Sequence, residues 1–232
     1  MPLILVLPLI LFLSTPLAAQ GFDQGMQAYN RGDFAAALNA WKPLAKSGNA
    51  AAQNEIGDLY YNGEGVPQNY AEAYRWFRMA ANQGDEIGQA NTGWMFEYGL
   101  GVAQDYEKAA YWYRKAADQG DAWAQNSVGV LYYNGQGLPQ DFSQAYKWYR
   151  RAAVQGQIYA QNNLGWMHEQ GEFVDRNTLI ALMWYDQAVK NGMDDAREAR
   201  DNIAAGLTFV ERIALMGMTK LCMGNNFKDC GD

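Results

Sequence analysis

Apolar and small residues recur along this chain with the spacing of α-helices. In one segment Ala52, Ile56 and Tyr60 follow one another at four-residue steps, which places them on one face of a helix. A second stripe follows, in which Trp76 and Phe77 lie among alanines, as close packing between antiparallel helices requires. A glycine-rich turn separates the two stripes, and glycine there permits a positive φ and ends a helix. The pattern therefore predicts a helical hairpin.

This hairpin recurs with a fixed step of 36 residues. The step is shown by four marker glycines, Gly57, Gly93, Gly129 and Gly165, and by four tryptophans, Trp76, Trp112, Trp148 and Trp184. The predicted units are 49–84, 85–120, 121–156 and 157–192, and each has a first helix (helix A) and a second helix (helix B). One such hairpin cannot bury its apolar face alone, so the units are expected to stack into an all-α array.

Capping residues and flanking segments complete this organisation. Each helix B is predicted to begin at a residue whose side chain accepts a backbone N–H of the first turn. These capping residues are Asn69, Asp105, Asp141 and Asn177. Segment 20–48 is predicted to be a shorter cap hairpin, in which Gly25, Tyr29, Gly32-Asp33-Phe34, Ala37 and Trp41 resemble a tetratricopeptide unit. Segment 193–232 is predicted to be a closing region with helices near 196–205 and 209–221.

The repeated residues resemble a known family. The pattern A-Q-x-x-φ-G-x-x-[YF]-x-x-G-x-G-[VL]-x-x-[DN]-x-x-x-A-x-x-W-x-x-x-A-A-x-x-G, where φ is apolar, is similar to the Sel-one-like repeat, a relative of the tetratricopeptide repeat. The resemblance covers about 49–192. It implies a right-handed α/α superhelical solenoid of about five helical hairpins with a C-terminal capping region. In the last unit Glu172-Phe173 replaces the second turn glycine, so we expect a weaker loop geometry there.

The first nineteen residues carry no charged side chain and contain an apolar run, residues 3–13. They read as a secretory signal peptide that is cleaved after Ala19, and the alternative is a retained membrane anchor. The expected location is therefore the periplasm or the exterior of a bacterial cell. The formal net charge of −7 argues against nucleic acid and anionic membranes as partners.

The two cysteines, Cys222 and Cys230, lie close together near the carboxyl end. In an exported protein such a pair predicts a disulfide that staples the last helix. A redox or metal-binding pair is the alternative, although the spacing matches neither kind of motif.

Residues for catalysis are sparse. The single histidine, His168, is accompanied by no nucleophile and no second metal ligand in the sequence pattern, so a solvated or packing role is expected. The glycine turns follow a helix rather than a strand and are not phosphate loops. We therefore expect no enzyme activity and no cofactor or metal.

The resemblance implies that the A helices line a concave groove, in which residues at positions −6, −3, +1 and +4 from each marker glycine face a protein or peptide partner. The selected groove residues are Asn54, Asp58, Tyr61, Trp94, Glu97, Trp123, Asn126, Tyr133, Tyr159, Asn162, Trp166 and Glu169. The three tryptophans could instead pack between hairpins as core. If they are exposed, aromatic and amide groups suit a binding surface, and the acids favour a basic partner.

Three functions remain in view. The leading hypothesis is an exported, non-enzymatic scaffold for protein–protein interaction. A second is a periplasmic immunity protein that neutralises a toxin, and a third, less favoured, is a cell-wall or β-lactam hydrolase.

Overall fold

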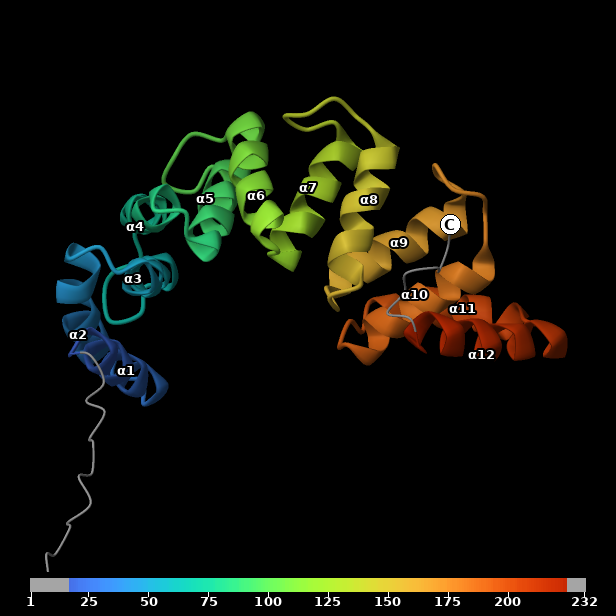
Figure 1. Cartoon of the computed structure of the whole chain (residues 1–232), viewed down its shortest axis with the longest axis horizontal. Helices are drawn as coiled ribbons and strands as arrows, with labels where there is room; N and C mark the ends of the chain where they lie inside the picture. Colours follow the sequence, from blue (N-terminus) through green and yellow to red (C-terminus); the bar gives the residue numbers. More distant parts are fainter. Residues whose placement is uncertain (1–16, 225–232) are drawn as a thin grey trace, which may run out of the picture.

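The structure is a computed structural model that describes residues 17–224, and this part of the chain contains helices and no strands (Figure 1). The helices are α1 (Leu17–Asn30), α2 (Phe34–Lys46), α3 (Ala50–Asn62), α4 (Tyr70–Asn82), α5 (Glu86–Tyr98), α6 (Tyr106–Gln119), α7 (Ala122–Asn134), α8 (Phe142–Ala153), α9 (Ile158–Gln170), α10 (Thr178–Lys190), α11 (Ala196–Gly206) and α12 (Phe209–Gly224).

Consecutive helices pair into five hairpins, from α1/α2 to α9/α10, and α11 and α12 close the array. Each helix packs mainly on its neighbours in the sequence, so the hairpins follow one another along an arch (Figure 1). The odd-numbered helices α1 to α9 are the A helices, and the even-numbered helices α2 to α10 are the B helices. The predicted all-α solenoid is confirmed.

The marker glycines let helices A and B of one hairpin approach closely. A Cβ atom placed on Gly129 would lie 2.6 Å from the Tyr149 ring, and one on Gly93 would lie 2.5 Å from the Tyr113 ring. Behind these contacts lies the core, in which Trp41 and Trp184 are fully buried. In each of these hairpins the aromatic ring of helix B therefore fills the space that the glycine of helix A leaves open.

The predicted capping residues begin the B helices. The side chain of Asp105 accepts a hydrogen bond from the backbone N–H of Lys108, and Asn69, Asp141 and Asn177 make the equivalent bond in their own hairpins. Such a cap contributes about 1 kcal/mol to the stability of a helix.

The loop of the last hairpin departs from the expectation. In the earlier loops the second glycine has a positive φ, as at Gly137 (67°), where a Cβ would lie 2.3 Å from a backbone atom of Tyr106. Phe173 holds the same conformation with φ 67°, a strained value for a residue with a side chain. The geometry is thus retained rather than weakened, and the exposed Phe173 ring lies 5.8 Å from Tyr146.

A ladder of buried glutamines joins successive hairpins, a role that the repeat pattern alone did not indicate. Gln125 donates to the backbone oxygen of Ala117 (3.1 Å) and accepts from Gln155 (2.8 Å). Gln53, Gln89 and Gln161 occupy the equivalent position and are also buried. Because Gln125 bonds Ala117 on the preceding hairpin and Gln155 on its own, this contact helps to fix the relative placement of the two hairpins.

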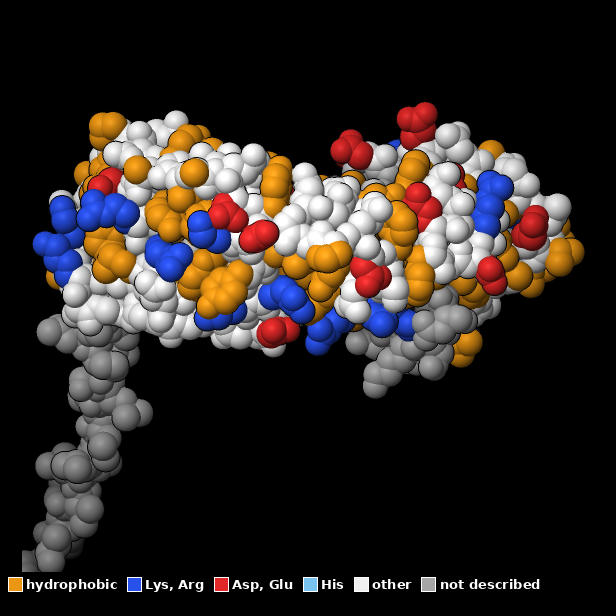
Figure 2. All heavy atoms as spheres, turned by 90° about the horizontal axis from the view of Figure 1, so that it is seen from above, with side chains coloured by type: hydrophobic (Ala, Val, Ile, Leu, Met, Phe, Trp, Pro, Cys, Tyr) orange, Lys and Arg blue, Asp and Glu red, His pale blue; other side chains and the backbone are white. Residues whose placement is uncertain are grey.

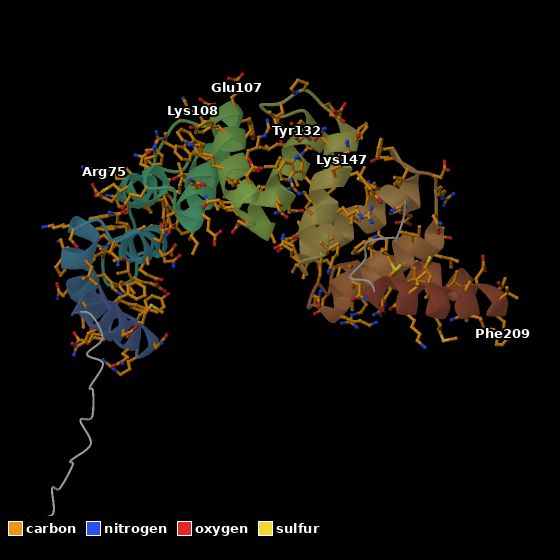
Figure 3. The ribbon with its side chains drawn as sticks, in the orientation of Figure 1. Arg75, Glu107, Lys108, Tyr132, Lys147 and Phe209 are labelled. Carbon is orange, nitrogen blue, oxygen red and sulfur yellow. The ribbon has the colours of Figure 1, made fainter. Side chains whose placement is uncertain are left out.

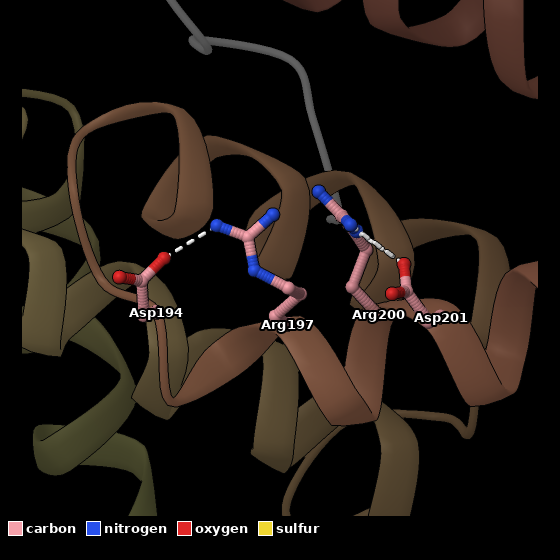
Figure 4. Close-up of polar contacts among 4 residues, drawn as sticks. All are labelled: Asp194, Arg197, Arg200 and Asp201. Carbon is pink, nitrogen blue, oxygen red and sulfur yellow. Dashed lines mark hydrogen bonds and ion pairs between the residues drawn. The ribbon is translucent and has the colours of Figure 1, made fainter.

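At the carboxyl end, two ion pairs line the surface of α11 (Figure 4). Arg197 pairs with Asp194, and Arg200 pairs with Asp201 at 2.6 Å. Cys222 on α12 is buried against the α8–α10 core. Its predicted partner Cys230 and the main part of the predicted signal peptide lie outside the described residues, so both remain predictions. Within residues 17–224 no helix has the length and apolar character needed to cross a bilayer.

Candidate functional site

Two matching clusters of a tyrosine, a tryptophan and a glutamate lie on the A helices. In the first, the indole Nε1–H of Trp94 on α5 donates to the Tyr61 hydroxyl of α3 (3.1 Å). In the second, Trp166 on α9 donates in the same way to Tyr133 of α7 (3.3 Å). The two clusters are two repeats apart, and helix α7 between them has Val130 at the position that holds tryptophan on α5 and α9.

A glutamate completes each cluster. Glu97 accepts from the hydroxyl of Tyr113 (2.6 Å), and Glu169 accepts from that of Tyr185 (2.7 Å). Burial raises the pKa of Glu97, while hydrogen bonds from Tyr113 and Tyr98 act in the opposite direction. These bonds hold both carboxylates in place next to the tryptophans.

The two clusters differ in accessibility. Trp94 is half-buried, because Tyr98 (ring centroids 4.1 Å apart) and Trp123 (5.5 Å) cover it. Trp123 in turn packs edge-on against Tyr113 at 5.3 Å and joins the core. Trp166, by contrast, is 46% exposed.

Trp166 lines a pocket of about 410 Å³ between α7, α8 and α9. Tyr133, Val130 and Asn162 line the same pocket. Trp166, Tyr133 and Asn162 are among the groove residues selected from the sequence, and Val130 holds the +1 position from its marker glycine. Glu172 accepts from Tyr133 and orients it. The pocket therefore joins an exposed indole, a fixed tyrosine and an amide.

Other selected residues lie elsewhere. Asn54 is 4% exposed and donates to Asp85 (2.7 Å), and Asn126 is 8% exposed and accepts from Asn163 (3.1 Å). These two amides hold neighbouring hairpins together and are not open to a partner. Tyr159 is exposed at the start of α9.

The A helices carry charge of one sign. The A helices α1, α3, α5, α7 and α9 carry six Asp or Glu residues and no Lys or Arg. On α3, burial and the nearby carboxylates of Glu55 and Glu64 raise the pKa of Asp58 to about 7. A cation brought next to Asp58 would favour its ionised form, so this surface is suited to a basic ligand.

His168 takes the packing role that was one of the expectations. It is 2% exposed, and burial together with the charge of Arg150 lowers its pKa to about 4, so it is neutral at physiological pH. Among residues 17–224, no three His, Cys, Asp or Glu side chains are grouped as metal ligands would be.

Stacked helical hairpins with a lined groove define the class of α/α repeat scaffolds. The sequence profile of the Sel1 repeat matches residues 50–85, 87–121, 124–157 and 158–193. The chain therefore belongs to the Sel1 repeat family, the family that its repeated residues resemble.

Solved structures agree with this assignment. A Sel1 repeat protein from Oxalobacter formigenes is 31% identical with a TM-score of 0.73, and the match covers 77% of this chain and 73% of that one. The protective antigen c5321 of uropathogenic Escherichia coli, described as an SLR fold, is 32% identical with a TM-score of 0.77. This match covers 90% of the present chain but only 46% of c5321.

An immunity protein from Pseudomonas aeruginosa shares the fold at 20% identity and a TM-score of 0.53, with 78% of this chain and 69% of that one covered. At this identity the likeness concerns the fold alone. The comparison with curated proteins found no match.

Proposed function

We propose that this protein is an exported, non-catalytic scaffold that binds an extended, basic segment of another protein along its A-helix face. Membership of the Sel1 repeat family supports a role in protein–protein interaction. The apolar, uncharged residues 1–19 support export. The observation that carries the proposal is the Trp166 pocket, which no Lys or Arg lines and beside which Glu172 bonds Tyr133.

The pocket suits one side chain of an extended ligand. An exposed, oriented tryptophan offers a large contact area at a small entropic cost, and tryptophan is enriched among interface residues whose loss costs more than 2 kcal/mol. Asn162 lines the same pocket and could bond the backbone of an extended segment. The acids of α3, α5 and α9 would attract Lys or Arg side chains elsewhere along the segment.

The specificity of the surface can be read with a peptide-display library. Peptides selected on the full chain should be enriched in Lys and Arg relative to the starting library. Trp166→Ala should weaken the binding of the selected peptides at least about tenfold, as expected for the loss of an interface hot spot.

Tyr111→Ala is the matched control, because Tyr111 is an aromatic residue of similar exposure (53%) on helix α6, away from the pocket. It should leave affinity unchanged. Absence of Lys and Arg enrichment among the peptides whose binding Trp166→Ala weakens, or equal losses in the two variants, would refute the proposal.

A further inference from the structure

A second pocket, of about 600 Å³, opens between the B helices α4 and α6, with residues of α5 at its base. Aromatic and cationic side chains line it together. Its aromatic members include Tyr74, Phe96, Tyr111 and Trp112, and its cations are Arg78, Lys108 and Lys115. None of these residues belongs to the A-helix pocket around Trp166.

Two cations from different helices lie over one indole ring. The Arg78 guanidinium of α4 is 4.5 Å from the ring centre of Trp112, and the Lys115 ammonium of α6 is 5.3 Å from it. Trp112 is 5% exposed, so its position is fixed by the core and it holds both cations in place. Two like charges at one ring repel each other, and an anion that bonds both of them would relieve this repulsion.

These two cations are not used by ion pairs of the fold. Lys108 pairs with Asp105 at 2.6 Å, but within residues 17–224 neither Arg78 nor Lys115 lies within ion-pair distance of a carboxylate. Arg78 donates only to the neutral side chain of Asn82, at 3.1 Å. The pocket therefore presents two oriented positive charges to a ligand.

The B helices around the pocket carry an excess of positive charge. They hold eleven Lys or Arg residues against four Asp or Glu, the reverse of the A helices. On the face of the arch seen in Figure 2, Lys and Arg side chains lie beside hydrophobic ones, with Asp and Glu side chains scattered among them. In Figure 3, Arg75, Lys108 and Lys147 lie along the outer edge of the arch, from α4 to α8.

We propose that the α4–α6 pocket is a second docking site, which binds an acidic, extended segment of a partner protein. Carboxylates of the segment bond Arg78 and Lys115, and its apolar atoms rest on Tyr74 and the exposed Tyr111. A peptide fits better than a polyanion such as nucleic acid, because the whole chain carries a net charge of −7 and Glu72 and Glu107 flank the pocket on α4 and α6. The protein then has two faces of opposite charge and can bridge two partners.

Fluorescence anisotropy with a labelled peptide, in which glutamate alternates with leucine and tyrosine, tests this site on the full chain. The wild-type protein should bind it and should not bind the same peptide with glutamine in place of glutamate. The double variant Arg78→Gln, Lys115→Gln should weaken binding at least about tenfold. Lys115→Glu, which changes only an exposed side chain, should abolish binding without loss of fold.

The control is Lys42→Gln, Lys46→Gln, which removes two charges from helix α2 of the same face but outside the pocket, and it should retain binding. Trp166→Ala should also retain it, so failure of this site is distinguishable from failure of the A-helix site. Equal losses of peptide affinity in the pocket variant (Arg78→Gln, Lys115→Gln) and the control variant (Lys42→Gln, Lys46→Gln) would overturn the proposal. So would absence of binding by the wild-type chain, or stronger binding to duplex DNA or to phosphatidylglycerol vesicles than to the peptide.

Discussion

Replacement of Asp58 by asparagine should stabilise the protein, and the gain should depend on pH. The pKa of Asp58 is raised from 3.8 to about 7, first by burial and then by Glu55 and Glu64. In the folded state the carboxyl therefore stays protonated up to neutral pH, whereas in the unfolded chain it ionises near 3.8. The free energy of unfolding is therefore lowered by Asp58. This loss of stability is absent below pH 3.8, grows as the pH rises from 3.8 to 7, and is constant above that range.

The size of the effect follows from the shift. Each pKa unit corresponds to 1.36 kcal/mol, so a shift of about three units gives an upper bound of about 4 kcal/mol. Because Asp58 is only partly buried, solvent screening reduces this to about 1–2 kcal/mol. For a chain of this size, Asp58→Asn should raise Tm by roughly 2–8 °C at pH 8.

Thermal unfolding followed by circular dichroism, at pH 8, 6 and 4, measures this gain. The difference between Asp58→Asn and wild type should be largest at pH 8 and nearly absent at pH 4. Glu107→Gln, which changes an exposed acid on α6, is the matched control and should change Tm little at any pH. A gain that is the same at all three pH values, or a loss of stability at pH 8, would refute the argument.

Three further predictions concern packing, a helix cap and a buried histidine. Gly129→Ala should cost about 1–3 kcal/mol in urea denaturation, since its Cβ would lie 2.6 Å from the Tyr149 ring, whereas Gly217→Ala meets nothing within 4 Å and should be neutral or stabilising. Asp141→Ala should cost about 1 kcal/mol in the same assay through loss of the α8 cap, and an unchanged midpoint would argue against that cap. The buried His168, with its pKa lowered to about 4, should make stability fall as the pH drops from 6.5 towards 4; His168→Phe should remove this dependence in pH-resolved Tm measurements, and its persistence would assign it to other groups.

The hairpins could be predicted because the forces that define them are local and repeated. A glycine that ends helix A, a capping Asp or Asn, and an aromatic residue opposite a marker glycine act within one unit of 36 residues. Their recurrence removes the ambiguity that a single copy would leave. The same reasoning failed at Phe173, where surrounding contacts impose a backbone conformation that the residue type disfavours.

The accessibility of the groove residues could not be predicted, because it depends on the next unit. Trp94 and Trp166 hold the same position in their repeats, but Trp123 of the following unit covers Trp94. After the last repeat, the position equivalent to Trp123 holds Asp195. Because no aromatic side chain follows there, Trp166 remains exposed. The segregation of charge between A and B helices was visible in the sequence once the helices were assigned, but the net charge of −7 concealed it.

The central claim, that partners of basic character bind along the A helices, is tested most directly by site-specific photo-crosslinking. A photoreactive phenylalanine analogue is placed at position 166 or, as a control, at position 111, and a labelled peptide rich in Lys and Arg that was selected on the wild-type chain is added. Crosslinking from position 166 and little from position 111 is the predicted result. Equal crosslinking from both positions, or crosslinking from position 111 alone, would contradict the account.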